Sequence, residues 1–396
     1  MKRYNLTAAA TALAVLALFA AANFTWGASP VKDVIKVGFL YENDESTPYT
    51  YNFALAQRAL ENQYPDRVET IVKSNVLATE TEEPLREMAR KGCAVIFTNT
   101  DSNQVMQAAK DFPAVQFCQE SYADLSTADA PENYHTFNGK IYQGWYVSGI
   151  AAGMKLKEML DAGEITADQA LVGFVSSYPT AEAISGYTAF LLGVRSVAKD
   201  ARMLVKYSHT GSSYSQEKAC AKELIDMGCI VISQHTHTIG PAVACEEASE
   251  SRKVFHVGYN QSMLDVAPTT ALISTRVNWT PYVVQAVEAV LAGKRIEQAV
   301  DGDVRGNDVG AGFEKGWVEM LDLNTLIAAE GTQEQVNRAI AAFKKGSLDV
   351  FRGDYIGVDP ENSTDVYDLS AGYMENQQSS APTFHYVLRD VIAIVR

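Results

Sequence analysis

Positive charge is scarce in this sequence. Its 396 residues include 33 lysines and arginines against 48 aspartates and glutamates, which gives a formal net charge of −15. A chain with this acidic balance is repelled by the phosphates of nucleic acids and by anionic lipid surfaces. We therefore expect neither nucleic acid nor a membrane surface among its partners.

Cysteine is also rare, and the number of cysteines is odd. Their spacing fits no zinc site, and a chain of this length does not depend on disulfides for stability. We interpret them as small buried apolar residues. The alternative is a bridge between Cys220 and Cys245, which fall on successive predicted helices. The five cysteines are Cys93, Cys118, Cys220, Cys229 and Cys245.

Recognisable catalytic signatures are missing. The chain has no Gly-x-Ser-x-Gly elbow, no Walker loop and no His-Glu-x-x-His motif. His235 and His237 share one face of a strand end, but no carboxylate or cysteine at a suitable spacing completes a metal site. We therefore expect no enzyme, no cofactor and no metal, and we keep an exported enzyme as the weaker rival.

Only one stretch is long and strongly apolar, and it lies at the N-terminus. Lys2 and Arg3 precede an apolar run over residues 8–22, and small residues follow at Gly27 and Ala28. This order is typical of a cleaved signal peptide, here residues 1–28. No cysteine near the cleavage site offers a lipid anchor, and no second run is long enough for insertion into a membrane. We expect a free periplasmic protein.

From residue 34 onward, apolar runs rich in Val, Ile and Phe alternate with amphipathic stretches. This alternation predicts an α/β protein with doubly wound parallel sheets. We expect strands at 34–41, 68–74, 94–98, 114–118, 134–137, 170–176, 203–208, 229–233, 253–258 and 272–275. We expect helices at 50–64, 80–91, 102–110, 142–160, 180–199, 215–228, 239–251, 280–291 and 332–346.

The length after cleavage favours two lobes, because one hydrophobic core seldom serves so many residues. We place the first lobe at 29–138 plus 277–312 and the second at 139–276 plus 313–396. The polar stretch 119–140 and the glycine-containing loop 303–315 are interpreted as crossings between them. After residue 346 the sequence is irregular and rich in Asp, Ser and Asn, and it ends in an apolar run at 386–395.

Ligands of open α/β sheets bind beyond the carboxyl ends of the strands. The loops there combine aromatic rings with amide and hydroxyl groups, and they lack the basic residues that a phosphate needs. A flat aromatic ligand suits this mixture, because rings stack on its faces while polar groups bind its edges. The candidate ligand-binding residues are Tyr49, Tyr51, Asn52, Thr98, Asp101, Ser177, Tyr178, Gln234, His235, Tyr259, Asn260, Asn278 and Trp279.

The same loops carry a family resemblance over residues 34–325. The chain resembles the basic membrane protein family of ABC-transporter substrate-binding proteins. Its motifs are Tyr-Asn-Phe at 51–53, Thr-Asn-Thr-Asp at 98–101, Tyr-Gln-Gly at 142–144, Ser-Ser-Tyr-Pro at 176–179, Gln-His-Thr at 234–236, Gly-Tyr-Asn at 258–260 and Asn-Trp at 278–279.

The resemblance implies a type I periplasmic-binding fold with two lobes and three crossovers. It also implies capture of a purine base or nucleoside by a monomer that delivers it to a membrane permease driven by a cytoplasmic ATPase. Tyr51 would stack on the ligand opposite Tyr178 or Trp279, with Asp101, Gln234 and Asn260 as polar contacts.

This chain departs from the family pattern at two places. The loop at 44–49 lacks a glycine-rich sequence, and Asn260 stands where relatives that bind nucleosides carry Asp. A neutral Asn260 favours a free base, because a ribose hydroxyl would lose a charge-assisted hydrogen bond there.

Simpler interpretations stand beside these. Tyr51 and Trp279 can be packing residues, and Asp101 can cap the helix that follows it. A periplasmic sensor subunit for a sugar or another small molecule is the alternative function.

Overall fold

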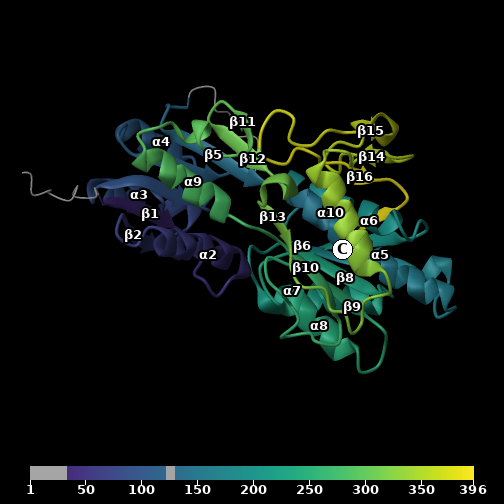
Figure 1. Cartoon of the computed structure of the whole chain (residues 1–396). Helices are drawn as coiled ribbons and strands as arrows, with labels where there is room; N and C mark the ends of the chain where they lie inside the picture. The colour runs from purple at the N-terminus through teal and green to yellow at the C-terminus, as the bar shows by residue number, and fades with distance from the viewer. Residues whose placement is uncertain (1–33, 122–129) are drawn as a thin grey trace, which may run out of the picture.

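The computed structural model describes residues 34–121 and 130–396, and its framework is a pair of seven-stranded sheets (Figure 1). The predicted signal peptide lies outside the described residues. Within them, every helix is too short or too polar to cross a bilayer. The α/β fold with parallel-dominated sheets confirms the predicted fold class.

The first sheet has the strand order β11-β12-β5-β4-β3-β1-β2, and all of its pairs are parallel except β11–β12. We call this sheet and its helices the first lobe. The strands are β1 (Ile35–Leu40), β2 (Val68–Lys73), β3 (Cys93–Thr98), β4 (Gln116–Glu120), β5 (Tyr134–Gly139), β11 (Asp303–Arg305) and β12 (Asp308–Ala311). The helices are α2 (Pro48–Gln63), α3 (Glu82–Arg90), α4 (Gln104–Asp111) and α9 (Thr280–Leu291).

The second sheet has the order β13-β10-β9-β8-β6-β7-β17, with only β10–β13 antiparallel. This sheet and its helices form the second lobe. The strands are β6 (Leu171–Ser176), β7 (Arg202–Tyr207), β8 (Val231–His235), β9 (Phe255–Tyr259), β10 (Ala271–Val277), β13 (Val318–Met320) and β17 (Ile392–Val395). The helices are α5 (Ile141–Asp161), α6 (Ala181–Arg195), α7 (Tyr214–Asp226), α8 (Gly240–Ala248) and α10 (Thr332–Lys344).

Close contact between α5 and α6 explains the small residues of these helices. A Cβ atom on Gly149 would lie 2.1 Å from the carbonyl oxygen of Phe190, and one on Gly193 would lie 2.0 Å from that of Tyr146. These distances leave no space for a methyl group, so the two backbones touch. The helices pack together on one face of the second sheet.

The chain passes between the two sheets at three places: after β5, after β10 and between β12 and β13. The polar stretch 119–140 is not the crossing itself, because β5 within it still pairs with β4 in the first sheet, and the chain leaves that sheet after Gly139, next to the predicted boundary at 138. The third region, predicted as loop, contains the hairpin β11–β12. Gly306 adopts φ 63° in its turn, which permits the tight connection.

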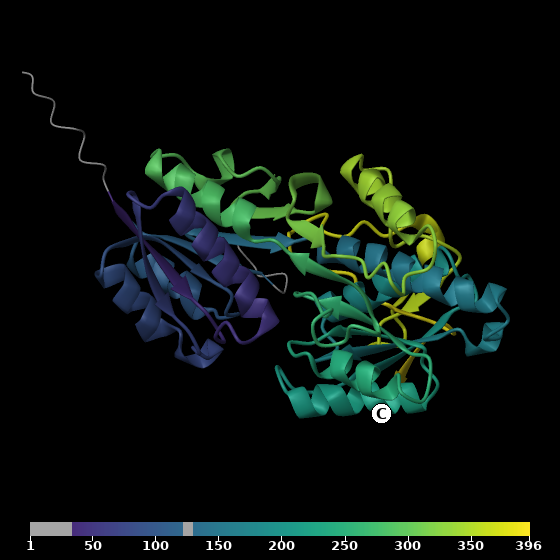
Figure 2. The same cartoon turned by 60° about the horizontal axis from the view of Figure 1, so that its bottom comes forward.

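The C-terminal segment, residues 349–396, packs on the second lobe and reaches the first, where Ser380 contacts Asp308 (Figure 2). It contains the three-stranded sheet of β14 (Ile356–Val358), β15 (Val366–Asp368) and β16 (Val387–Leu388). The predicted apolar run at 386–395 is thus divided between two sheets, because β17 pairs with β7.

The five cysteines are buried and unpaired, so the possible Cys220–Cys245 bridge is not formed. Burial raises the pKa of Cys93 to about 11 and that of Cys229 to about 12. Such thiols are poor nucleophiles at neutral pH.

Candidate functional site

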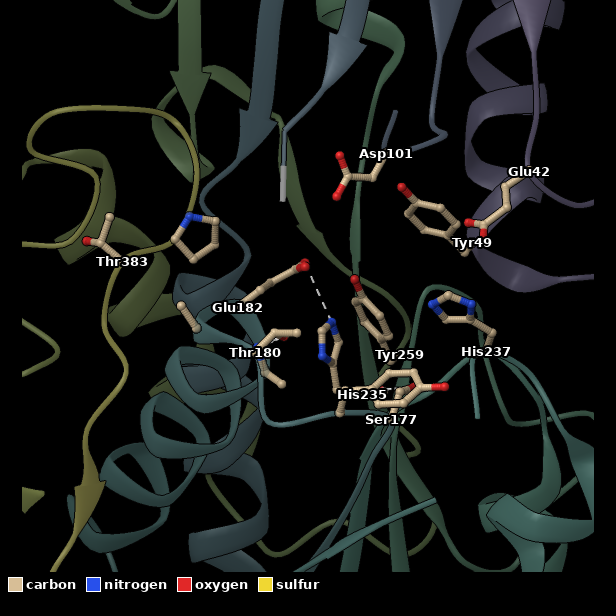
Figure 3. A pocket seen from close by; sticks show the side chains of 15 residues that line it. Glu42, Tyr49, Asp101, Ser177, Thr180, Glu182, His235, His237, Tyr259 and Thr383 are labelled. Atoms are coloured by element: carbon tan, nitrogen blue, oxygen red, sulfur yellow. Dashed lines mark hydrogen bonds and ion pairs between the residues drawn. The ribbon is translucent and has the colours of Figure 1, made fainter. Parts of the chain in front are cut away.

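A cavity of about 530 Å³ opens where the carboxyl ends of strands from both sheets meet (Figure 3). Its walls come from the loops after β1, β3, β6, β7 and β8, from the last residues of β8 and β9, from α2 and α6, and from the C-terminal segment. This is the place at which open α/β sheets bind ligands. The lining residues are Glu42, Tyr49, Asp101, Ser177, Tyr178, Thr180, Ala181, Glu182, Ala183, Gly211, His235, His237, Tyr259, Pro382 and Thr383.

Hydrogen bonds within the loops hold these walls in place. Asn99 accepts the backbone N–H of Glu42 at 2.9 Å, which ties the loop after β1 to the loop after β3. On the other lobe, the Thr180 hydroxyl accepts the N–H of Ala183 at 3.3 Å and caps α6. This cap stabilises the helix start that carries Glu182.

Aromatic rings form much of the cavity surface. Tyr49 of the first lobe stacks on His237 of the second, with ring centroids 5.2 Å apart and an interplanar angle of 11°. Burial lowers the pKa of His237 to about 4, so this ring is neutral at physiological pH. Tyr259 packs beside Trp145 at 4.8 Å, and Tyr178 is 45% exposed at the rim.

Carboxyl groups line both sides of the cavity. Glu42 and Asp101 belong to the first lobe, and burial raises the pKa of each. Glu182 lies on the second lobe, 3.6 Å from Nε2 of His235. Behind the wall, the buried Glu120 accepts a hydrogen bond from the Tyr49 hydroxyl.

The structure brings part of the predicted set together at this cavity. The predicted residues that line it are Tyr49, Asp101, Ser177, Tyr178, His235 and Tyr259. Asp101 does not cap α4, whose N-cap is Asn103. The carboxylate near His235, which sequence spacing did not reveal, is Glu182 from another element of the second lobe.

Several other predicted residues lie just behind the walls. The Nδ2 of Asn52 donates to the backbone oxygen of Asn260 at 2.9 Å and to its Oδ1 at 3.0 Å, which links the two lobes. Thr98 is buried and accepts the N–H of Thr100 at 3.0 Å. The amide of Gln234 donates to the carbonyl of Thr238 at 2.7 Å. These contacts shape the loops around the cavity.

Asn278, Trp279 and Tyr51 lie away from the cavity lining. Asn278 donates to Glu319 at 2.9 Å beside the third passage of the chain. Trp279 is only 1% exposed, and its ring stacks on Phe53 at 4.7 Å, so it belongs to the core of the first lobe. Tyr51 is 39% exposed on α2, where its ring faces the guanidinium of Arg58. The structure therefore places these two rings as packing and surface residues.

Several lining residues were not among the predicted ligand-binding residues. Glu42 and His237 stand in strand-end loops that the sequence singles out, so their position was a usable signal. Glu182 follows such a loop in the first turn of α6. Pro382 and Thr383 come from the C-terminal segment, for which the sequence offers no such signal.

Acid should destabilise the protein through the buried His256. Its Nε2 donates to Gln234 Oε1 at 3.1 Å, and burial lowers its pKa from 6.5 to about 3. Between these values the unfolded chain binds a proton that the folded protein does not, so stability falls as pH falls. Urea unfolding from pH 7 to 4 should show this loss, up to about 1.4 kcal/mol per pH unit from one such group.

The variant His256→Asn should be less stable at pH 7 and should lose less stability on acidification. An equal loss in both proteins would show that His256 does not carry the effect.

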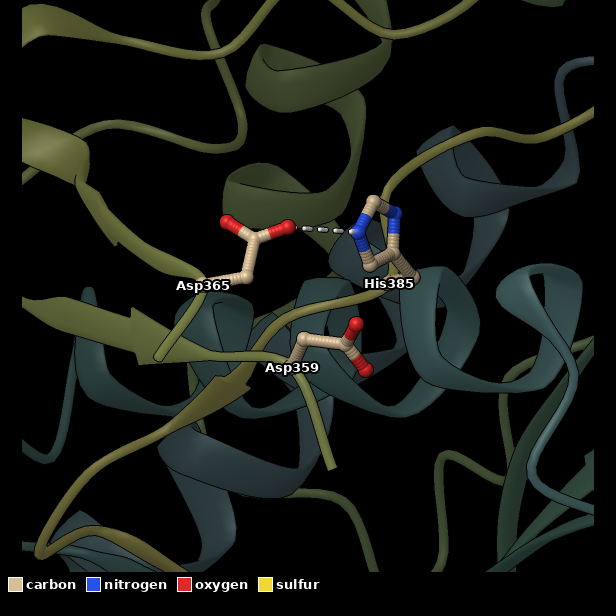
Figure 4. Close-up of side chains that lie close together, drawn as sticks. All are labelled: Asp359, Asp365 and His385. Carbon is tan, nitrogen blue, oxygen red and sulfur yellow. Dashed lines mark ion pairs between the residues drawn. The ribbon is translucent and has the colours of Figure 1, made fainter. Parts of the chain in front are cut away.

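Asp359, Asp365 and His385 lie together in the C-terminal segment, away from the cavity (Figure 4). The Nε2 of His385 is 3.9 Å from Asp365 Oδ2, and all three residues are partly exposed. Partly exposed acidic groups of this kind are common without a metal, and we assign none here.

Comparisons with known proteins show the family of the chain. Residues 35–347 match the family model described as "ABC transporter substrate-binding protein PnrA-like". A purine-binding protein of Brucella abortus is 28% identical over 83% of this chain and 86% of its own length. A putative ABC transporter glucose-binding protein of Haloferax volcanii is 25% identical over 83% of this chain and 76% of its own length.

The fold is also found among solved structures. An ABC transporter solute-binding protein from Conexibacter woesei superposes with a TM-score of 0.63 at 15% identity, covering 80% of this chain and 98% of that one. This likeness concerns the fold, and the family match confirms the resemblance found in the sequence. The chain belongs to the family of PnrA-like ABC transporter substrate-binding proteins.

Proposed function

We propose that this substrate-binding protein captures a planar heterocycle, a purine base or a purine nucleoside, in the cavity between its two lobes. The carrying observation is the composition of that cavity, which combines the rings of Tyr49, Tyr178 and Tyr259 with carboxyl and hydroxyl groups from both lobes. Rings bind the faces of such a ligand and polar groups bind its edges. The name of the Brucella abortus relative supports the same ligand class.

The proposed mechanism is closure of the lobes on the ligand. The lobes, 29–138 plus 277–312 and 139–276 plus 313–396, would rotate about the three passages of the chain. A ligand that contacts both lobes favours the closed state by its extra contacts there. The closed form, a monomer in the periplasm, would then dock on a permease driven by a cytoplasmic ATPase.

A sugar is the second candidate ligand, because the Haloferax volcanii relative is named as glucose-binding. Tyrosine rings and carboxylates also suit a sugar, whose C–H faces pack on rings while its hydroxyls donate to acids. The same site could serve a periplasmic sensor subunit in place of an importer.

A thermal-shift screen of the ligand-stripped protein tests these proposals. It would include adenine, guanine, hypoxanthine, purine nucleosides, sugars and amino acids. A ligand at 100 times its Kd stabilises the folded state by roughly 2.7 kcal/mol, which a melting curve detects easily. We expect shifts with purine compounds alone, and shifts with sugars alone would overturn the purine proposal.

Two exposed tyrosines offer a matched pair of variants for the ligand found. Tyr178→Ala removes a ring from the cavity rim and should weaken purine binding about tenfold, since one stacked ring contributes roughly 1–3 kcal/mol. Tyr51→Ala removes a ring of similar exposure outside the cavity lining and should leave the Kd unchanged. Equal affinities in both variants would remove Tyr178 from the site.

A further inference from the structure

The cavity is lined by acidic side chains, without lysine or arginine among the described lining residues. Glu42, Asp101 and Glu182 line it, and Glu120 lies directly behind Tyr49. Of the two histidines present, His237 is neutral at physiological pH. An anionic ligand would therefore enter a site without a fixed positive partner.

The carboxyl groups come from opposite lobes. Figure 3 shows Asp101 and Glu42 on the first-lobe side, with Glu182 reaching toward the cavity from the second-lobe side. The groups influence one another, because burial and then the charges of Glu182, Glu42 and Asp101 raise the pKa of Glu120 well above its usual value. Like charges in a cleft of low dielectric repel more strongly than in water.

We propose that the cavity selects ligands by a donor-rich, positively polarised edge held between Glu182 of the second lobe and Glu42 and Asp101 of the first. This inference rests on the proposed capture function and deepens it. Amino-substituted heterocycles and amidines fit such an edge, because their N–H groups donate to carboxylates from both sides. Ligands bearing phosphate or carboxylate groups are rejected.

The same arrangement couples binding to closure. Carboxylates on facing lobes oppose their approach in the empty protein, since no lysine or arginine of the described lining separates them. A ligand that places N–H donors between them replaces this repulsion by charge-assisted hydrogen bonds to both lobes. Glu182 is well placed for this role, because it is 12% exposed and already oriented by His235.

Isothermal titration calorimetry with two matched pairs of probes tests the inference. Adenine and hypoxanthine differ in an amino group against an oxo group, and benzamidine and benzoate are flat rings of opposite charge. We expect adenine to bind at least about tenfold more tightly than hypoxanthine, and benzamidine to bind where benzoate does not. Glu182→Gln and Asp101→Asn should each weaken adenine and benzamidine about tenfold and should reduce both preferences.

The control is Glu164→Gln, which removes a charge that pairs with Lys253 outside the cavity lining and should change no Kd. Equal Kd values for adenine and hypoxanthine, unchanged in the Glu182→Gln and Asp101→Asn variants, would overturn the inference and leave the purine proposal intact. Benzamidine binding that depends on Glu182, without any purine binding, would overturn the purine proposal alone. Absence of binding by adenine, hypoxanthine and benzamidine alike would overturn both.

Discussion

Replacing Trp279 by alanine should lower the free energy of unfolding by about 3–5 kcal/mol. The indole is 1% exposed and packs face to face on Phe53, with ring centroids 4.7 Å apart, and edge to face on Phe137 at 5.4 Å. Its removal would leave a cavity at the start of α9, where the chain re-enters the first lobe. Urea denaturation followed by circular dichroism would measure the loss.

Tyr51→Ala is the matched aromatic control, because that ring is 39% exposed on α2. A surface substitution of this kind should change stability by less than about 0.5 kcal/mol. A Trp279→Ala protein with normal stability and weakened ligand binding would reverse our assignment and return the indole to the ligand site.

Glu375→Gln should cost about 2–3 kcal/mol and should also disturb the cavity. The buried carboxylate of Glu375 accepts the N–H groups of Thr383 and Phe384, the Thr383 hydroxyl and the Ser185 hydroxyl. Glutamine keeps the shape but turns an NH₂ group toward one of these donors, and an unsatisfied buried group is costly. Since Thr383 lines the cavity, the ligand Kd should rise as well.

Glu361→Gln makes the same chemical change on an exposed loop between β14 and β15, so its stability should match that of the parent protein. Thermal unfolding with and without ligand separates the two effects. Unchanged melting of the Glu375→Gln protein would show that the C-terminal segment is not anchored by this carboxylate.

Periodicity predicted most of the fold, because buried parallel strands are continuous apolar runs that need no knowledge of their neighbours. Periodicity did not predict strands whose pairing depends on a turn or on residues distant in the sequence. The strand at 303–305 is only three residues long, and its pairing with 308–311 depends on a turn at Gly306. The strand at 392–395 pairs with residues 203–206, and nothing local to either segment indicates this pairing.

The position of the cavity between the lobes was predictable, whereas the direction of individual side chains was not. Strand-end loops led to Tyr49, Asp101, Tyr178 and His235, which line the cavity. Trp279 stands in an equivalent loop, yet its side chain turns into the core. A sequence pattern gives the end of a strand but does not give the rotation of the residue beyond it.

The route of the chain has a consequence for how the protein loses its structure. Thr136 of β5 pairs with Asp308 of β12, so the edge of the first sheet is completed only by residues that follow most of the second lobe. Neither lobe is made from one continuous stretch of the chain. Unfolding of either lobe therefore disturbs strands that lead directly into the other. The two lobes should therefore unfold as one cooperative unit, with a single heat-absorption peak, although each has its own sheet.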